Sequence, residues 1–210
     1  MTTCIITFAD ENVLSYFKYC YPILKKWCNN MNYDLKVFSK NHTESTHHWM
    51  KIYYLLEVLK QNNYNLICFL DADIVINNMH LDLTNFLVDD KDIYICKNGW
   101  NGGELLNTGS ILIKNTKNSL EFLEQVWSKH NGEYANNYWH EQSIVNQLYG
   151  KYHYMIKPLE MRDLNSYGDD DIINAPNNNL YHFMAKSLDR KIEYVKNHIN
   201  ILKQKGILYD

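Results

Sequence analysis

Residues 66–76 constrain the fold of this chain most strongly. Leu66–Leu70 is an unbroken apolar run, which predicts a strand that is buried on both faces, as in a parallel sheet. Asp71 and Asp73 follow it directly, at the end of the strand where open α/β sheets bind their ligands. Two carboxylates one residue apart can bind one hard divalent cation. The alternative is a polar turn that only ends the strand, because Asp is common in turns.

The chain before this strand predicts a doubly wound α/β sheet. Thr3–Phe8 is a short apolar strand, residues 13–31 repeat apolar side chains at helical spacing, and residues 33–39 alternate as a second strand. A second helical pattern at 49–59 leads into Leu66–Leu70. Two β-α steps therefore precede the carboxylate pair.

Two residues bear on the first helix, and the remaining elements follow from the same patterns. Asp10 is the expected N-cap, and Pro22 is expected to kink or divide the helix. Further strands are expected at 93–96, 110–113, 152–156 and 180–183, helices at 81–87, 119–130, 139–148 and 187–205, and a long loop at 163–179. At 210 residues the chain has the length of one α/β domain, so we expect a single domain over residues 1–210.

Composition and charge exclude several classes of protein. Hydrophobic residues make up 46% of the chain and charged residues 21%, which is typical of a globular domain. The net charge of −3 and the lack of a Lys/Arg cluster argue against nucleic acid as a partner. No apolar run reaches the length of a membrane span, so no span is predicted.

The cysteines indicate the redox compartment of the protein, and the amino-acid composition indicates the base composition of its gene. The five cysteines are odd in number and form no C-x-x-C, and Cys4 and Cys68 lie inside expected strands. We therefore expect reduced, buried thiols and a soluble, cytoplasmic protein. Abundant Asn, Lys, Ile and Tyr indicate a low-GC gene, from a bacterial or viral source.

Five short motifs occur along the chain in a fixed order. They are WMK at 49–51, FLDADIVI at 69–76, LNTGSILIKN ending at Asn115, EQS at 141–143 and HF at 182–183. Together they resemble the nucleotide-sugar glycosyltransferases of the GT-A fold, most closely the galactosyl- and xylosyltransferase family (family 34), with family 8 related. The resemblance covers roughly residues 3–187 and implies a Rossmann-like mixed sheet with helices on both faces. Two departures from the family are noted: we expect no membrane anchor or stem, and the stretch HFMAKS has no glycine.

The resemblance implies a metal-dependent transfer of a sugar from a nucleoside-diphosphate sugar, UDP-hexose or UDP-pentose, to a glycan, glycoprotein or other hydroxyl acceptor. Asp71, Asp73 and His182 are the expected metal ligands, and Asp71 either shares the metal or binds the ribose. Mn²⁺ is favoured over Mg²⁺ because it accepts imidazole more readily. The alternative for His182 is a core histidine beside Tyr181 and Phe183.

Five further residues are candidates for binding the donor nucleotide. Lys51 and Lys186 are cations for the diphosphate or for Asp71, although a lysine on a helix is more often solvated. Thr7, Phe8 and Asp10 end the first strand at the same sheet edge, so they are expected to hold the nucleobase.

The resemblance also places residues beside the donor sugar. Asn107 is expected against its hydroxyls, since an amide both donates and accepts. Gln142 is placed beside the anomeric carbon and Glu141 near the sugar hydroxyls, which makes these two the candidate catalytic residues. Glu141 can instead complement a helix dipole. The family is retaining, which favours retention, whereas inversion needs a carboxylate base, either Glu141 or one within 169–171.

Two other functions fit part of the pattern. D-A-D-I-V also matches aspartyl-nucleophile phosphatases, with Asp71 as the nucleophile and Asp73 as the acid. Such a pair usually opens its domain, whereas two β-α steps come first here. A non-catalytic sugar- or nucleotide-binding domain is the other alternative, and it would not need the carboxylates, Gln142 and His182 together.

Overall fold

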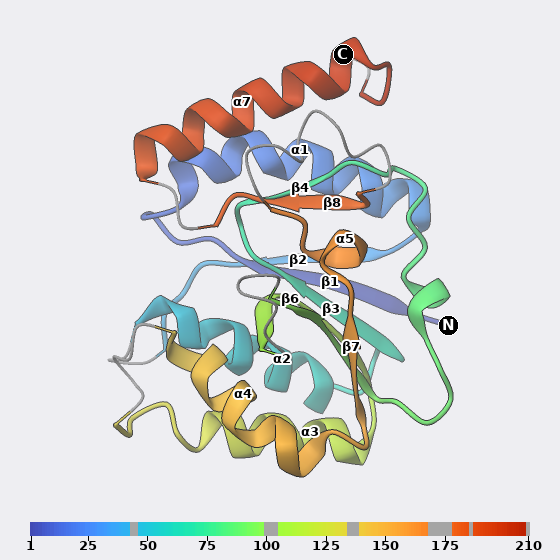
Figure 1. The fold of residues 1–210 in the computed structure, drawn as a ribbon, viewed down its shortest axis with the longest axis vertical. Coiled ribbons are helices and arrows are strands. Elements are labelled where there is room, and N and C mark those ends of the chain that lie inside the picture. Colours follow the sequence, from blue (N-terminus) through green and yellow to red (C-terminus); the bar gives the residue numbers. More distant parts are fainter. Residues whose placement is uncertain (43–45, 99–104, 134–138, 168–177, 185–186, 209–210) are drawn as a thin grey trace.

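A six-stranded mixed sheet forms the centre of the molecule (Figure 1). The structure, a computed structural model, describes residues 1–42, 46–98, 105–133, 139–167, 178–184 and 187–208. The strand order is β2-β1-β3-β6-β5-β7. The strands are β1 (Thr3–Phe8), β2 (Asp34–Phe38), β3 (Leu66–Leu70), β5 (Ile93–Lys97), β6 (Leu106–Lys114) and β7 (Ile156–Leu159). β1 pairs in parallel with β2 and β3, whereas β6 runs antiparallel to both β3 and β5.

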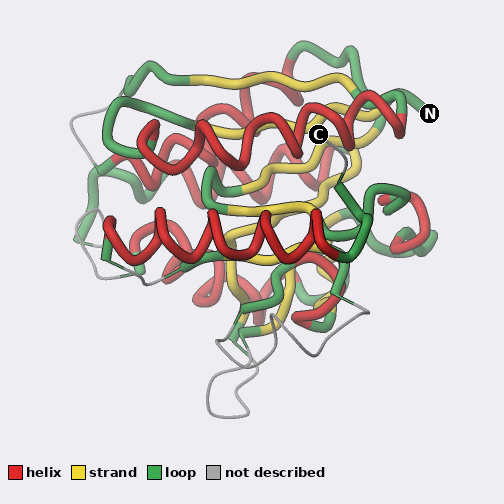
Figure 2. The backbone as a smooth tube through the Cα atoms, turned by 90° about the horizontal axis from the view of Figure 1, so that it is seen from above, coloured by secondary structure: helices red, strands yellow, loops and turns green. Residues whose placement is uncertain are grey.

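Helices cover both faces of this sheet, as the sequence predicted. Leu66, Cys68 and Leu70 of β3 face one apolar cluster, which α1 (Leu14–Met31) and α7 (Leu188–Gln204) complete (Figures 1 and 2). Ile67 and Phe69 face the other cluster, with α2 (Met50–Lys60), α3 (Lys117–Trp127) and α4 (His140–Tyr152). The whole of β3 is buried, because both sides of its pleat pack against helices.

A second, two-stranded sheet brings the C-terminal part of the chain to the end of β3. It pairs β4 (Ile74–Ile76) with β8 (Leu180–His182) in antiparallel fashion, and Ile74 lies opposite His182. The backbone N–H of Phe183 donates to the carbonyl of Asp73 at 3.1 Å. The pairing therefore fixes His182 beside the turn that carries Asp71 and Asp73.

The first helix differs from its prediction at two residues. Its N-cap is Val13, and the side chain of Asp10 instead accepts from the backbone N–H of Asn12 at 3.0 Å. Pro22 lies inside one continuous helix and does not divide it. A proline removes one helical hydrogen bond, but buried residues on both sides of Pro22, from Phe17 to Trp27, hold the two halves in line.

Some other predicted boundaries also shift. Tyr152 belongs to α4 and the following strand starts only at Ile156, so the strand predicted at 152–156 is wrong. β6 is longer than predicted and includes the LNT of its motif, because Leu106 and Asn107 pair with β5. The helix predicted at 81–87 is a short 3-10 helix, η2 (Leu83–Phe86). The loop predicted at 163–179 begins with α5 (Met161–Leu164), and residues 168–177 lie outside the described residues.

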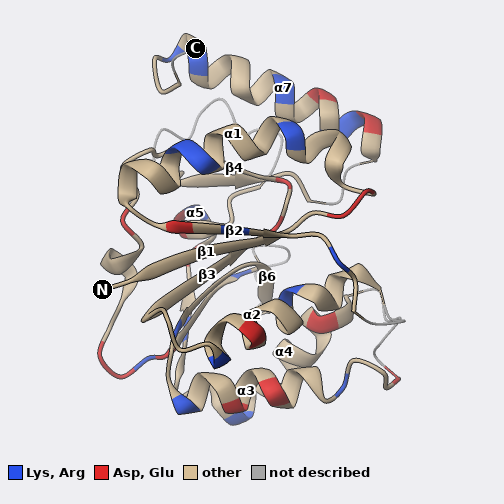
Figure 3. Ribbon diagram, turned by 180° about the vertical axis from the view of Figure 1, so that it is seen from behind, with Lys and Arg blue, Asp and Glu red and all other residues tan. Residues whose placement is uncertain are grey.

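Two surface features of the described helices bear on possible partners, namely their apolar length and their charge. Among the described residues, none of the helices combines the length and the apolar character that crossing a membrane requires. Acidic and basic side chains both occur along the outer helices α3 and α7 (Figure 3).

Candidate active site

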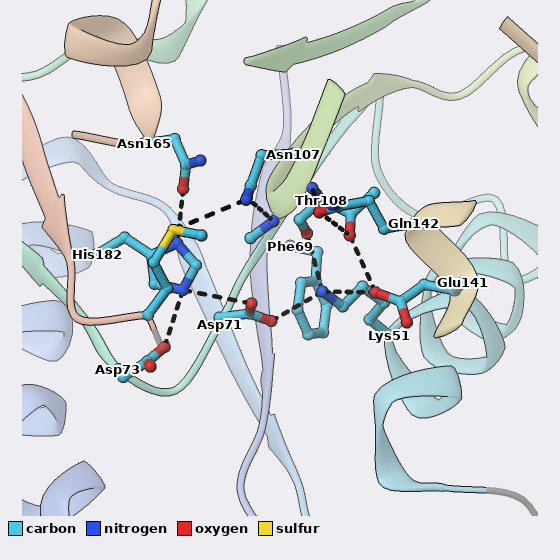
Figure 4. A network of polar contacts seen from close by, with 12 residues as sticks. Lys51, Phe69, Asp71, Asp73, Asn107, Thr108, Glu141, Gln142, Asn165 and His182 are labelled. Atoms are coloured by element: carbon cyan, nitrogen blue, oxygen red, sulfur yellow. Dashed lines mark hydrogen bonds and ion pairs between the residues drawn. The ribbon is translucent and has the colours of Figure 1, made fainter. Parts of the chain in front are cut away.

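Elements far apart in the sequence meet at the carboxyl end of β3 (Figure 4). The turn after β3 carries the two aspartates, β6 passes beside it, and the backbone N–H of Asp71 donates to the carbonyl of Gly109 at 2.8 Å. The functional side chains come from α2 (Lys51), β6 (Asn107 and Thr108), α4 (Glu141 and Gln142), β8 (His182) and α7 (Lys191).

Asp71, Asp73 and His182 form a cluster whose ligand atoms all lie within 4.8 Å of one another. The His182 Nε2 atom lies 3.1 Å from Asp73 Oδ1 and 3.6 Å from Asp71 Oδ2. On its other side, His182 Nδ1 lies 2.8 Å from Asn165 Oδ1. Because an amide oxygen only accepts, Nδ1 is the donor in this contact and Nε2 is the ring nitrogen that faces the carboxylates. Such an arrangement needs a proton or a cation between the three groups, so the cluster fits a divalent metal.

Gly109 makes room for the imidazole of this cluster. A Cβ atom at that position would lie 2.3 Å from His182 Cε1, 2.5 Å from His182 Nδ1 and 2.9 Å from Asn165 Oδ1. The backbone N–H of Gly109 donates to Asn107 Oδ1 at 2.9 Å. The histidine ring therefore packs directly on the backbone of β6, which only a glycine permits.

Lys51 joins the metal cluster to α4. Its Nζ lies 3.0 Å from Asp71 Oδ1 and 3.0 Å from Glu141 Oε1, and it donates to the carbonyl of Thr108 at 2.9 Å. Burial opposes the charge of Lys51, but Asp71 and Glu141 outweigh it and raise the pKa of the lysine above its usual range. All three ammonium protons have partners, so Lys51 orients the two carboxylates.

The first turn of α4 is fastened to β6. Gln142 Oε1 accepts from the backbone N–H of Thr108 at 3.0 Å, and Glu141 Oε1 accepts from the Thr108 hydroxyl at 2.9 Å. Asn146 exchanges hydrogen bonds of 2.7 and 2.9 Å with the backbone of Leu106. Glu141 Oε2 is buried and has no hydrogen-bond partner among the described residues. An orphaned buried oxygen of this kind is an acceptor that a bound ligand can satisfy.

Lys191 is the second cation of the site. Its Nζ lies 2.5 Å from Asp73 Oδ2 and 4.8 Å from the centre of the Tyr16 ring. Burial alone would raise the pKa of Asp73, but His182 and Lys191 outweigh it and hold that pKa well below its usual range. Lys186, the lysine expected from the sequence, lies outside the described residues.

Two cavities meet at the cluster. The larger, of about 580 Å³, is lined by His48, Lys51, Asp71, Asp73, Asn107, Thr108, Gly109, Trp139, His140, Glu141, Gln142, His182, Met184 and Lys191. The smaller, of about 110 Å³, is lined by Phe8, Val13, Tyr16, His47, His48, Lys51, Phe69, Asp71, Ala72, Asp73 and Lys191. The two aspartates and both lysines belong to both linings, so the cluster lies where the cavities join.

Most of the predicted site residues that the structure describes line the two cavities, and two of them do not. Of the three nucleobase candidates, Phe8 lines the smaller cavity, whereas Thr7 and Asp10 line neither. Thr7 is fully buried in β1, and Asp10 holds a turn. Sequence reasoning missed Asn165 and Lys191, because no local pattern marks either residue. Thr108 lay inside the LNTGS motif and was overlooked.

The family of the chain follows from its sequence profile. The profile of the nucleotide-diphospho-sugar transferase family matches residues 11–197. This chain belongs to that family. It is a glycosyltransferase of the nucleotide-diphospho-sugar type, with an Asp-Asp-His cluster that fits a metal, and the expected enzyme class is confirmed. The family therefore decides against the two alternatives left by the sequence, an aspartyl-nucleophile phosphatase and a non-catalytic binding domain. A comparison with curated proteins found no significant match.

Solved structures of glycosyltransferases share the fold. One involved in the glycosylation of the major capsid of PBCV-1 is 14% identical with a TM-score of 0.79, over 94% of this chain and 100% of that one. GlyE of Streptococcus pneumoniae TIGR4 is 14% identical with a TM-score of 0.62, over 100% of this chain and 65% of GlyE. The galactosyltransferase LgtC is 11% identical with a TM-score of 0.60, over 96% and 95%. These similarities confirm the predicted GT-A architecture.

Proposed function

We propose that residues 1–210, as one domain, transfer a sugar with retention from a UDP-hexose or UDP-pentose to a hydroxyl of a glycan or glycoprotein, with Mn²⁺ as the metal. The observation that carries this proposal is the position of Asp71, Asp73 and His182 at the junction of a small aromatic cavity and a larger polar one. A nucleotide-sugar has the same order of parts, with its diphosphate between the base and the sugar.

The metal would be held by Asp71, Asp73 and His182. When bound, it would supply positive charge that stabilises the departing diphosphate. The imidazole among the ligands favours Mn²⁺ over Mg²⁺. Lys191 pairs with Asp73 and would be free to turn to a phosphate oxygen once Asp73 binds the metal.

The nucleoside would occupy the smaller cavity. Phe8 and Tyr16 supply aromatic walls there, which suit the flat face of a nucleobase. The choice of UDP rests on the resemblance to the family.

The sugar would lie in the larger cavity against Asn107, Glu141 and Gln142. The unsatisfied Glu141 Oε2 can accept from a sugar hydroxyl. Because Gln142 Oε1 is bound to the Thr108 N–H, the amide NH₂ of Gln142 is the group left to meet the substrate. Retention is supported by the state of Glu141. Among the described residues of this cavity it is the one carboxylate outside the metal cluster, and its Oε1 is already engaged by Lys51 and by the Thr108 hydroxyl.

A thermal-shift experiment with UDP tests the site. Mn²⁺ together with UDP should raise the melting temperature, and EDTA should abolish the rise. Asp73→Asn should lose this stabilisation, whereas Asp90→Asn, at an exposed carboxylate, should keep it. Equal stabilisation by UDP in EDTA would refute the metal bridge, and a stronger response to GDP or ADP would refute UDP.

A product analysis tests the chemistry. Slow hydrolysis of the UDP-sugar should release UDP, and NMR of the first sugar product should show the donor's anomeric configuration. Gln142→Ala should lower kcat on the order of 10²-fold with Mn²⁺-UDP affinity unchanged, because its contact is made mainly in the transition state. An inverted first product would refute retention.

A further inference from the structure

The rim of the larger cavity carries rings, whereas its floor carries charges. Trp139 lines this cavity with 41% of its surface exposed, while Trp27 and Trp49 are fully buried in the two cores. His140 and His48 line the same cavity. An exposed tryptophan at the mouth of a polar cavity is a candidate contact for a ligand with an apolar face.

This rim is held in place by contacts between α4 and the segment before α2. The rings of His48 and His140 stack with centroids 4.3 Å apart and an angle of 12° between their planes. The hydroxyl of Thr46 lies 3.2 Å from His140 Nδ1. His140 has φ +44°, in the left-handed region that a side chain makes unfavourable. The neighbouring contacts hold this conformation and so fix the backbone that presents Trp139.

Trp139 also lies at a defined place relative to the proposed chemistry. The backbone N–H of Gln142 donates to the carbonyl of Trp139 at 2.9 Å, so Trp139 lies at the N-terminal end of α4, beside the turn that carries Gln142. Both residues line the larger cavity. A ring that contacts Trp139 therefore lies next to a sugar that contacts Gln142.

We propose that Trp139, backed by His140, is the stacking surface for the acceptor, and that the acceptor is a pyranoside. The inference rests on the proposed function, because the donor sugar must occupy the floor beside Asn107 and Gln142. The apolar C–H face of the acceptor ring lies on the indole, and its attacking hydroxyl points to the floor. The volume of about 580 Å³ falls within the ~300–1,000 Å³ of cavities that hold drug-sized ligands, which leaves room for two sugar rings.

The position of the diphosphate decides that the ring on Trp139 is the acceptor. In the proposed function the metal cluster would hold the diphosphate, and the smaller cavity, which Phe8 lines, would receive the nucleoside. The donor sugar is tethered to that diphosphate and lies on the polar floor. Trp139 is on the exposed rim, where a second molecule enters.

The test compares acceptor use with donor hydrolysis in the Mn²⁺-loaded full chain. Methyl glucopyranosides and methyl galactopyranosides of both anomers serve as acceptor probes, and glycerol serves as a hydroxyl compound without a ring. Release of UDP is measured with and without each probe. Trp139→Ala should raise the KM for the glycosides roughly tenfold, while hydrolysis without acceptor and Mn²⁺-UDP binding stay within twofold. Trp139→Phe should restore most of the loss, and transfer to glycerol should not change.

A matched control separates stacking from general loss of an exposed aromatic residue. Tyr154 is 55% exposed and lines neither cavity, so Tyr154→Ala should behave as wild type. An unchanged KM for the glycosides in Trp139→Ala overturns the proposal, as does an equal fall in donor hydrolysis, which would assign Trp139 to the donor. If no glycoside accelerates UDP release from a donor that the enzyme hydrolyses, the pyranoside assignment is wrong while the proposed function stands. Failure of the wild type to bind Mn²⁺-UDP refutes the proposed function itself.

Discussion

The contact between Gly109 and His182 predicts how a single methyl group would weaken the metal site. In Gly109→Ala the new Cβ would lie 2.3 Å from His182 Cε1, whereas ordinary contacts begin at 3.4 Å. The imidazole must therefore retreat by about 1.1 Å. It cannot do so alone, because Nδ1 is bound to Asn165 Oδ1 at 2.8 Å and that oxygen would itself lie 2.9 Å from the new methyl group.

The magnitude follows from the loss of a fixed ligand. Disturbing the groups that orient a metal-bound histidine typically lowers metal affinity about 10–100-fold. We therefore expect Gly109→Ala to bind Mn²⁺ about 10–100-fold more weakly. Overpacking of a buried site should also lower the free energy of unfolding by about 1–3 kcal/mol.

Calorimetric titration with Mn²⁺, below the melting temperature of each variant, measures the first effect, and urea unfolding without metal measures the second. Gly150→Ala is the control, because its Cβ meets nothing within 4 Å and it lies in α4. That variant should bind Mn²⁺ as wild type does and gain about 0.5–1 kcal/mol of stability. A folded Gly109→Ala with wild-type Mn²⁺ affinity would refute the reasoning that places His182 among the ligands.

Three further predictions concern buried titratable groups, two at the site and one outside it. Lys191→Met should bind Mn²⁺ a few-fold more tightly without nucleotide, because the metal no longer competes with the lysine for Asp73. The same variant should bind UDP about tenfold more weakly at saturating Mn²⁺. Calorimetry that finds neither change would contradict the role of Lys191. Lys51→Met leaves Glu141 buried without a cation, so urea unfolding should show a free energy of unfolding lower by about 3–5 kcal/mol. The double variant Lys51→Met with Glu141→Gln should recover part of this loss. A loss below about 1 kcal/mol would mean that the ion pair contributes no more than one on the surface. Burial lowers the pKa of His198 to about 4, below its ordinary 6.5, so the unfolded chain binds more protons between these values and the free energy of unfolding should fall as the pH drops from 6.5 to 4. His198→Gln should flatten that slope, and an unchanged slope would show that other groups produce it.

The sequence by itself determined the buried central strand and the place of the carboxylates. Leu66–Leu70 is apolar at every position, which is the pattern of a strand covered on both faces, and that burial is observed. Asp71 and Asp73 come directly after it, so their position at the sheet edge needed no further information. The order of the motifs also predicted that β6, α4 and His182 contribute to the site. Each motif is a contiguous stretch, so it can be recognised in the sequence without knowledge of the packing.

Local signals were less reliable where packing decides the outcome. Asp10 has the right side chain for a cap and Pro22 the wrong one for a helix interior, yet α1 begins at Leu14 and continues through Pro22. Propensities of this kind amount to about 1–3 kcal/mol, and burial of one helix face on a sheet outweighs them.

Only the tertiary structure decided which polar groups meet. Lys191 reaches Asp73 across 118 residues because α7 packs on α1, and Asn165 meets His182 because its neighbour Ser166 pairs with β8. Lys51 was expected beside the diphosphate or Asp71, whereas its second carboxylate partner, Glu141, is brought to it by α4. Periodicity and motifs report the local preferences of contiguous residues, whereas these contacts depend on how separate elements pack, and no local pattern records that packing.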